Sequence, residues 1–170
     1  MYNPVSGNQD EEYIELLNIA DVGLTLGEYD TELFVDVPWR LTDSGGISFD
    51  LPLGVTMAPG EYLVLAKSVN AFSNAYPAVG DDVQVFEWGP GKLDNSGEKV
   101  QLSKPGDEVE GVRYYVRVDR VNYSDGFGPG GLDPWSTEPD GYGKSLMRKV
   151  PADYGNEPLN WIAAAPSPGE

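Results

Sequence analysis

The sequence predicts an all-β fold, a two-layer β-sandwich of about eight to ten short strands. Three observations lead to this prediction. Glycine and proline supply 21 and 14 of the 170 residues, which indicates many turns and few long helices. Short runs of β-branched and aromatic residues recur between these turn residues along the chain. Hydrophobic residues make up 40% of the sequence, as in globular proteins, so we expect a single ordered domain over residues 1–170.

The first half of the chain contains several strand patterns and one looser segment. Strands are expected at Tyr13–Leu17, Leu24–Leu26, Trp39–Leu41, Ile47–Leu51 and Tyr62–Ala66. The looser segment, Ile19–Asp36, holds two glycines and several acidic residues, and we expect most of it to be an exposed insertion. Tyr62–Ala66 follows a proline-glycine turn and is apolar throughout. Such a run predicts a central strand that is covered on both faces.

The second half continues with one helix, further strands and a long loop. Val69–Tyr76 is expected to form a short helix, with Phe72 and Tyr76 on one face because they are four residues apart. Proline and glycine in Lys104–Asp107 predict a hairpin turn there. Strands are expected at Val83–Trp88, Glu98–Leu102, Val109–Tyr115, Leu146–Val150 and Asn160–Ala163, with Val112–Tyr123 as one long bent strand or a strand pair.

The segment Ser124–Gly143 has no strand pattern and is long for a structureless loop, which favours a functional role. It contains Phe127, Trp135 and Tyr142, and Trp88 lies beside another turn. Exposed rings in loops stack on sugars or anchor protein partners, so these four residues are candidates for partner binding. In the alternative interpretation the rings of the loop fold back and cap the end of the sandwich.

The same loop is rich in oxygen ligands of the kind that calcium prefers. Its candidate metal ligands are Asp125, Asp133, Glu138 and Asp140. Their spacing does not match the calcium-binding loop of an EF-hand, and the alternative is an acidic loop exposed to solvent. Calcium is therefore the one cofactor for which the sequence offers candidate ligands.

Composition excludes several classes of function. The chain has 28 acidic and 11 basic residues, a formal charge of −17, so we expect no nucleic-acid binding and no membrane insertion. Because it has neither cysteine nor histidine, thiolate, zinc-thiolate and Ser-His-Asp chemistry are excluded. Paired carboxylates remain, but exposed turns and strand faces explain them better, so we expect no enzyme. The acidic groups considered are Asp81 with Asp82, Asp107 with Glu108 and Glu110, and Asp133 with Glu138 and Asp140.

Seven weak motifs follow one another in the order found in lamin-tail domains. They are Tyr2-Asn3-Pro4 with Glu12–Leu16, Trp39–Asp43 with Phe49–Thr56, Ala58–Leu65, Leu93 with Asn95–Leu102, Asp119–Tyr123, Gly143–Arg148, and Asn160-Trp161 with Pro166–Gly169. Over nearly its whole length the chain thus resembles a lamin-tail domain of the bacterial exported type. The segments Ile19–Asp36 and Ser124–Asp140 are longer than that pattern requires.

The resemblance implies an immunoglobulin-like β-sandwich without catalytic residues. It implies a non-catalytic interaction or structural module of an exported or cell-surface protein, used in adhesion, anchoring or partner recognition. The partner would be a protein or a cell-surface glycan, and the location extracellular. The alternative is a calcium-dependent carbohydrate-binding module appended to a hydrolase. We expect the chain to be part of a longer protein, with any targeting signal outside it.

Overall fold

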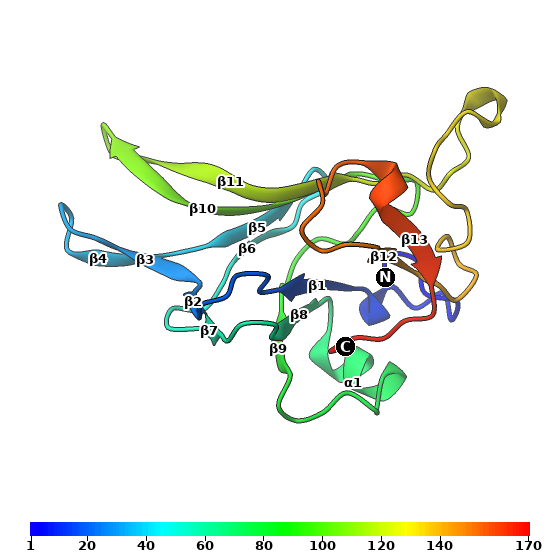
Figure 1. Cartoon of the computed structure of the whole chain (residues 1–170), viewed down its shortest axis with the longest axis horizontal. Coiled ribbons are helices and arrows are strands. Elements are labelled where there is room, and N and C mark those ends of the chain that lie inside the picture. Colours follow the sequence, from blue (N-terminus) through cyan, green and yellow to red (C-terminus); the bar gives the residue numbers. More distant parts are fainter.

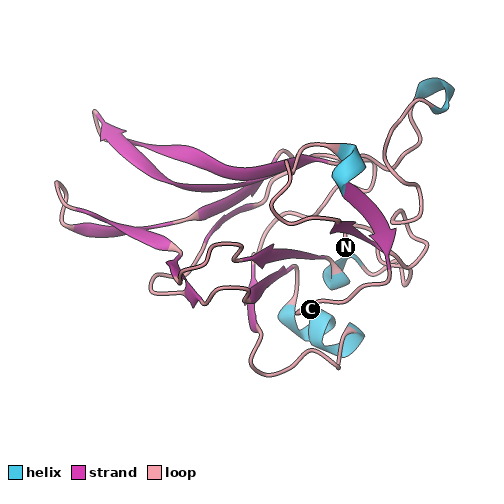
Figure 2. Ribbon diagram, in the orientation of Figure 1, coloured by secondary structure: helices cyan, strands magenta, loops and turns pink.

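The computed structural model describes residues 1–170, which form a mostly β structure with thirteen strands and one short α-helix (Figure 1, Figure 2). The strands are β1 (Tyr13–Leu17), β2 (Leu24–Thr25), β3 (Gly27–Asp30), β4 (Val35–Pro38), β5 (Arg40–Asp43), β6 (Ser48–Asp50), β7 (Thr56–Met57), β8 (Tyr62–Ala66), β9 (Gln84–Glu87), β10 (Lys99–Val109), β11 (Val112–Asn122), β12 (Ser145–Arg148) and β13 (Trp161–Ala164). The helix α1 spans Val69–Ala75, and short 3-10 helices lie at Gln9–Glu11, Pro129–Gly131 and Pro158–Asn160. No helix is both long and apolar enough to span a membrane.

Strand β8 is the centre of the first sheet, whose order is β1-β8-β9. The side chains of Leu63–Ala66 are fully buried, which confirms the prediction of a central strand covered on both faces. Leu63 and Leu65 face the main hydrophobic core, while Val64 and Ala66 face a smaller cluster under α1. Strand β1 pairs with β8 in antiparallel orientation and β9 pairs in parallel, with α1 in the connection between β8 and β9.

The predicted helix is present and covers the first sheet. The hydroxyl of Ser68 accepts a hydrogen bond from the backbone N–H of Ala71 and so caps the start of α1. Phe72 is buried, and its ring and that of Tyr76 both lie against Tyr13 of β1, with centroid distances of 5.4 and 5.2 Å. The spacing of four residues therefore placed both rings on the buried face of the helix, as predicted.

The second sheet has the order β11-β10-β5-β6 and carries a long hairpin, β10–β11. The predicted turn at Lys104–Asp107 is wrong, because Pro105 pairs with Tyr115 and the chain reverses only at Glu110–Gly111. Strand β5 pairs with β10 only as far as Ser103, so from there on β10 has no hydrogen-bonded strand on that side. A proline, which lacks an N–H, is tolerated there next to a β-bulge.

Glu110→Asn is expected to raise the free energy of unfolding by about 1 kcal/mol. Glu110 and Gly111 both have positive φ, at 53° and 79°, as in a tight two-residue hairpin turn. A glutamate is strained in this left-handed conformation, whereas asparagine adopts it more easily. Urea unfolding measures the change. Asp107→Asn removes the same charge from the same hairpin without relief of a positive φ, so it should leave stability nearly unchanged; equal gains would contradict the explanation.

The looser segment Ile19–Asp36 contains more structure than expected. It forms β2, which pairs with β7, and most of the β3–β4 hairpin. These short strands bring the total to thirteen, above the expected number. Figure 1 shows the β3–β4 and β10–β11 hairpins projecting from the same side of the molecule, and polar contacts described below join them.

The main hydrophobic core takes side chains from both of the larger sheets. Its buried members are Tyr2, Leu26, Leu41, Ile47, Leu51, Val55, Met57, Leu63, Leu65, Trp88, Leu93, Val100 and Tyr123. The half-buried Ile14, Leu16 and Leu146 pack against it from β1 and β12. Strands β12 and β13 pair with each other near the predicted positions, and Ser124–Gly143 forms no strand, as expected.

Candidate functional site

An apolar cleft of about 650 Å³ lies beside the main core. Three strands border it with runs of consecutive residues, Tyr13–Leu17 of β1, Val118–Val121 of β11 and Ser145–Arg148 of β12. Because successive side chains of a strand point to opposite faces, a continuous run of lining residues means that each strand meets the cleft with its edge. The indole rings of Trp39 and Trp161 belong to two further walls. A largely apolar cleft of this size is typical of a binding site.

Strand β1 presents an unpaired edge on the side away from β8. Tyr13 exchanges both of its backbone hydrogen bonds with Met1, at 3.1 and 3.0 Å, and none with β8. In an antiparallel pair alternate residues bond to the same neighbour, so Glu15 and Leu17 also turn their N–H and C=O groups away from β8. Neither residue forms a backbone hydrogen bond with any other segment. This row of free donors and acceptors borders the cleft.

A few polar groups line the otherwise apolar cleft. Arg148 donates to the carboxylate of Asp119 at 2.5 Å, and its guanidinium lies 5.0 Å from the ring centroid of Trp161. Trp39 Nε1 and Arg120 Nε are buried and have no hydrogen-bond acceptor. A buried N–H without an acceptor costs about 1–3 kcal/mol. Two residues of the cleft wall thus have unused donors.

An apolar stripe on the β10–β11 hairpin continues from the cleft. We define the hairpin stripe as Val109, Val112, Tyr114, Val116 and Val118, each between 45% and 58% exposed. Val112, Tyr114 and Val116 alternate along β11 and share one face, and Val109 is paired with Val112 across the hairpin. Val118, the last member, also lines the cleft. The stripe and the cleft therefore meet at Val118, where a register shift between Arg117 and Asp119 interrupts the alternation of β11.

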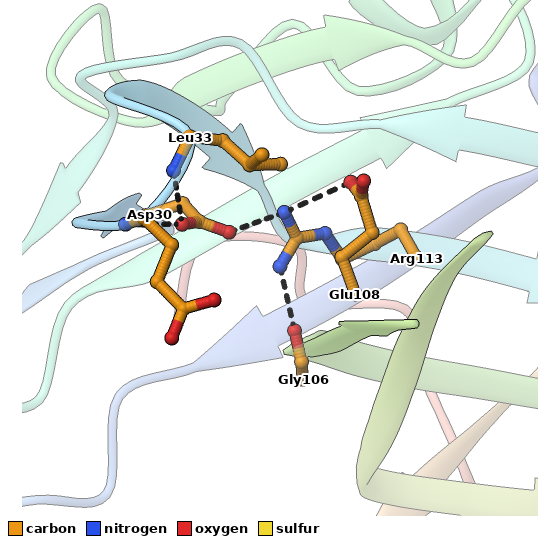
Figure 3. A network of polar contacts seen from close by, with 6 residues as sticks. Asp30, Leu33, Gly106, Glu108 and Arg113 are labelled. Atoms are coloured by element: carbon orange, nitrogen blue, oxygen red, sulfur yellow. Dashed lines mark hydrogen bonds and ion pairs between the residues drawn. The ribbon is translucent and has the colours of Figure 1, made fainter. Parts of the chain in front are cut away.

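Polar contacts of Arg113 hold the two projecting hairpins together (Figure 3). Its guanidinium forms an ion pair with Asp30 at the end of β3, contacts Glu108 at 3.3 Å and donates to the backbone oxygen of Gly106 at 2.8 Å. The carboxylate of Asp30 also accepts the backbone N–H of Leu33. That bond, followed by the contact with Arg113, lowers the pKa of Asp30 below its ordinary value. Asp30 therefore stays charged at neutral pH and keeps the hairpins joined.

Charged groups occupy the face of the hairpin opposite the stripe. Arg40 lies over the ring of Tyr115, 4.3 Å from its centroid, and donates to Asp50 at 2.5 and 3.0 Å. On the other face, Lys104 lies directly across from Val116 of the stripe and joins the two hairpins through Glu28 at 3.5 Å. These partly exposed pairs contribute less than about 1 kcal/mol each. The Arg40 contacts thus occupy the face opposite the stripe, whereas Lys104 is a charged neighbour of Val116 on the stripe's own face.

The four aromatic residues predicted to bind a partner occupy different environments. Phe127 and Tyr142 are exposed in the loop, as a binding role requires. Trp135 is half-buried, packs against the main core and lies 6.3 Å from the ring centroid of Trp161. Trp88 is 2% exposed and belongs to the core, so its ring is not available to a partner. The turn that follows it suggested exposure, but its backbone N–H bonds to Ala66 of β8 and its ring packs into the core.

Trp135→Ala is expected to destabilise the domain by about 2 kcal/mol, because it removes a half-buried ring from the edge of the core. Phe127→Ala, in the same loop but exposed, should change stability by less than about 0.5 kcal/mol. Urea unfolding of the two variants separates a ring that caps the core from a ring that is free to bind. Equal stability of both variants would show that Trp135 does not cap the core.

The four predicted metal ligands each have a local partner instead of a common centre. Asp125 accepts the N–H of Phe127, Asp133 accepts the Ser124 hydroxyl and the N–H of Trp135, Glu138 contacts Lys144, and Asp140 accepts from the amide of Asn3. Nowhere in the chain do three acidic side chains gather in a way that could hold a metal ion. Three of the four, Asp140, Asp125 and Asp133, nevertheless lie near the Tyr2 hydroxyl, whose pKa is raised first by burial and then by these carboxylates.

The sequence interpretation did not identify the cleft or the hairpin stripe as a site. The alternation of Val112, Tyr114, Val116 and Val118 with polar or charged residues was visible. It predicted a strand, but alternation alone does not show which face another element covers. Comparison of the chain with protein-family models, with curated proteins and with solved structures gives no match.

Proposed function

We propose that this domain is a non-catalytic protein-recognition module that binds its partner through the cleft and the hairpin stripe. The observation that carries the proposal is the hairpin stripe, a row of half-exposed apolar side chains that runs into an apolar cleft. Contiguous exposed apolar surface on a soluble domain marks interaction sites. An edge strand as long as β11, with one apolar face, is also prone to associate with other chains.

The charge of the domain favours particular partners. With a net charge of −17, two copies of the chain repel each other, and association with a basic protein is accelerated. Acidic Asp107, Glu108 and Glu110 stand at the tip of the hairpin beside the stripe. A partner with apolar side chains flanked by lysine or arginine complements this surface best.

Panning a displayed library of random linear peptides against the domain tests the proposal. Peptides that bind the wild-type domain should lose at least about tenfold in affinity for Val116→Asp. The substitution lies on an exposed strand position opposite Lys104, so the fold should be retained, which circular dichroism checks. Leu159→Asp, at an exposed apolar position away from the stripe, is the matched control and should bind normally. The proposal fails if no peptide is enriched, or if Val116→Asp binds as well as the control.

A cell-surface glycan is the second candidate partner, and the exposed rings of Phe127 and Tyr142 favour it. Leu132, 85% exposed, extends the apolar surface of their loop. A glycan array probed with and without calcium tests this candidate. Binding that is lost in Phe127→Ala and Tyr142→Ala supports it, and dependence on calcium supports the metal as cofactor. An array on which the domain binds no glycan would exclude this candidate partner.

For the fold we propose an immunoglobulin-like β-sandwich of the lamin-tail type, and for the location the cell exterior. The order of the seven sequence motifs supports the fold, as does the main core shared by the β1-β8-β9 and β11-β10-β5-β6 sheets. An experimental structure tests the first proposal through the packing of the two sheets. Fractionation of cells that produce the full protein tests the second.

A further inference from the structure

We infer that the cleft binds an extended segment of a partner protein, which adds as a strand to the free edge of β1. This inference rests on the proposed function and specifies its partner and binding mode. Glu15 and Leu17 offer N–H and C=O groups at the two-residue spacing to which a neighbouring strand bonds. A rounded apolar molecule would leave these groups without partners.

The unused donors of the cleft wall indicate what the bound segment must supply. Trp39 Nε1 and Arg120 Nε are buried donors without acceptors, on residues that line the same cleft. A peptide in extended conformation carries a backbone carbonyl at every residue, and alternate carbonyls point away from the strand with which it pairs. One edge of the segment can then bond to β1. The other edge offers acceptors to these donors once their side chains shift, because both nitrogen atoms are closed to solvent in the unbound domain.

The lining of the cleft and its charges specify the side chains of the segment. Leu16, Leu146 and Trp161 contribute apolar surface, so alternate positions of the segment should be apolar. Among the charged residues of the lining, Arg148 is paired with Asp119. The remaining acidic residues, Glu15, Asp153 and Glu170, outnumber Arg120 and favour basic residues next to the apolar ones. A second copy of this chain, which is strongly acidic, fits the same site poorly.

The experiment uses the intact domain and, as probe, the tightest-binding linear dodecapeptide recovered by panning. Two synthetic versions are compared, each methylated at alternate backbone nitrogens, one on the odd and one on the even positions. In strand addition only one of the two sets donates to β1, so one version should bind at least about tenfold more weakly while the other retains its affinity. Amide hydrogen exchange of Glu15 and Leu17 should slow at least about tenfold when the unmodified peptide binds.

A variant of the domain tests the unused donor. Trp39→Phe keeps an aromatic ring but removes the indole N–H. It should lower the affinity of the domain for the peptide by roughly fivefold and should not lower the thermal midpoint of the domain. Normal affinity in this variant would show that the N–H is not used by the peptide.

Other outcomes separate this inference from the proposed function. If the peptide binds Val116→Asp more weakly than the wild-type domain but both methylated versions bind equally, strand addition is wrong and protein recognition stands. If no peptide binds, both fail. Dimers of the domain alone in sedimentation, abolished by Leu16→Asp, would assign the cleft to a second copy. Saturable binding of decanoate with exclusion of the peptide would assign it to a small apolar ligand. Either result overturns the inference.

Discussion

Glu12→Gln is expected to stabilise the domain by about 2 kcal/mol more at pH 8.5 than at pH 5.5. Glu12 is 0% exposed, and only one of its carboxylate oxygens, Oε2, has a partner, the backbone N–H of Leu93 at 2.8 Å. Oε1 is buried without a donor. Burial disfavours the charged form and raises the pKa of Glu12 to about 7, although the Leu93 bond and the nearby Lys92 partly oppose the shift.

The direction of the pH dependence follows from the raised pKa. The contribution of Glu12 to stability is complete below its ordinary value of 4.5 and is lost as the pH rises through about 7. The full loss amounts to about 3 kcal/mol, and about 2 kcal/mol of it falls between pH 5.5 and 8.5. Glutamine carries no charge at either pH, so the advantage of the variant grows as the pH rises.

The comparison must be made between variant and wild type at each pH. Burial lowers the pKa of the Met1 amine to about 5, and this group titrates in the opposite sense, losing stability as the pH falls through its unfolded and then its folded value. Urea unfolding at both pH values, with the exposed Glu32→Gln as control, isolates the part that belongs to Glu12. An advantage of Glu12→Gln that is the same at both pH values would mean that Glu12 ionises normally in the folded domain.

Strands and helices whose structure depends mainly on their own residues could be predicted from the sequence. Tyr62–Ala66 is a short apolar run that follows a proline-glycine turn, which favours a strand covered on both faces. Phe72 of α1 and Tyr76, which caps the end of the helix, are four residues apart, and both rings meet Tyr13 as that spacing requires. In these elements local pattern and tertiary environment agree.

The hairpin turn and the cleft could not be predicted because they depend on partners far away in the sequence. Locally, Lys104–Asp107 is a stronger turn signal than Glu110–Gly111. The turn moves because β5 stops pairing at Ser103 and a bulge accommodates Pro105. The cleft likewise consists of strand edges, and the sequence of a strand does not show which of its edges remains free.

The candidate residues of the loop show a second reason why the site could not be predicted from the sequence. The aromatic and acidic composition of Ser124–Gly143 predicted a binding loop, and Phe127 and Tyr142 are indeed exposed. The carboxylates of Asp125 and Asp133, however, accept N–H groups two residues further along. Aspartate forms such bonds in turns regardless of any metal, so acidic density in a loop predicts turns as readily as ligands.

Gly97→Ala is expected to destabilise the domain by about 4 kcal/mol or more, the largest effect of any single substitution considered. Gly97 has φ 109°, and an added Cβ would lie 2.5 Å from Cα of Ser124 and closer still to the backbone oxygen of Tyr123. Neither atom belongs to a flexible side chain, so the backbone itself must move. Gly97 lies just before β10, and Tyr123 and Ser124 mark the start of the long loop after β11. The strain therefore falls on the contact that joins the second sheet to this loop.

Gly60→Ala is the matched control for this prediction. Gly60 also has a positive φ, 75°, but no atom lies within 4 Å of an added Cβ. It should cost only about 1–2 kcal/mol, the penalty of the left-handed conformation alone. Urea unfolding of both variants then measures the close backbone approach as the difference between them, about 2–3 kcal/mol. If Gly97→Ala costs no more than Gly60→Ala, the loop does not pack against this turn, and the end of β11 beside the cleft must be placed differently.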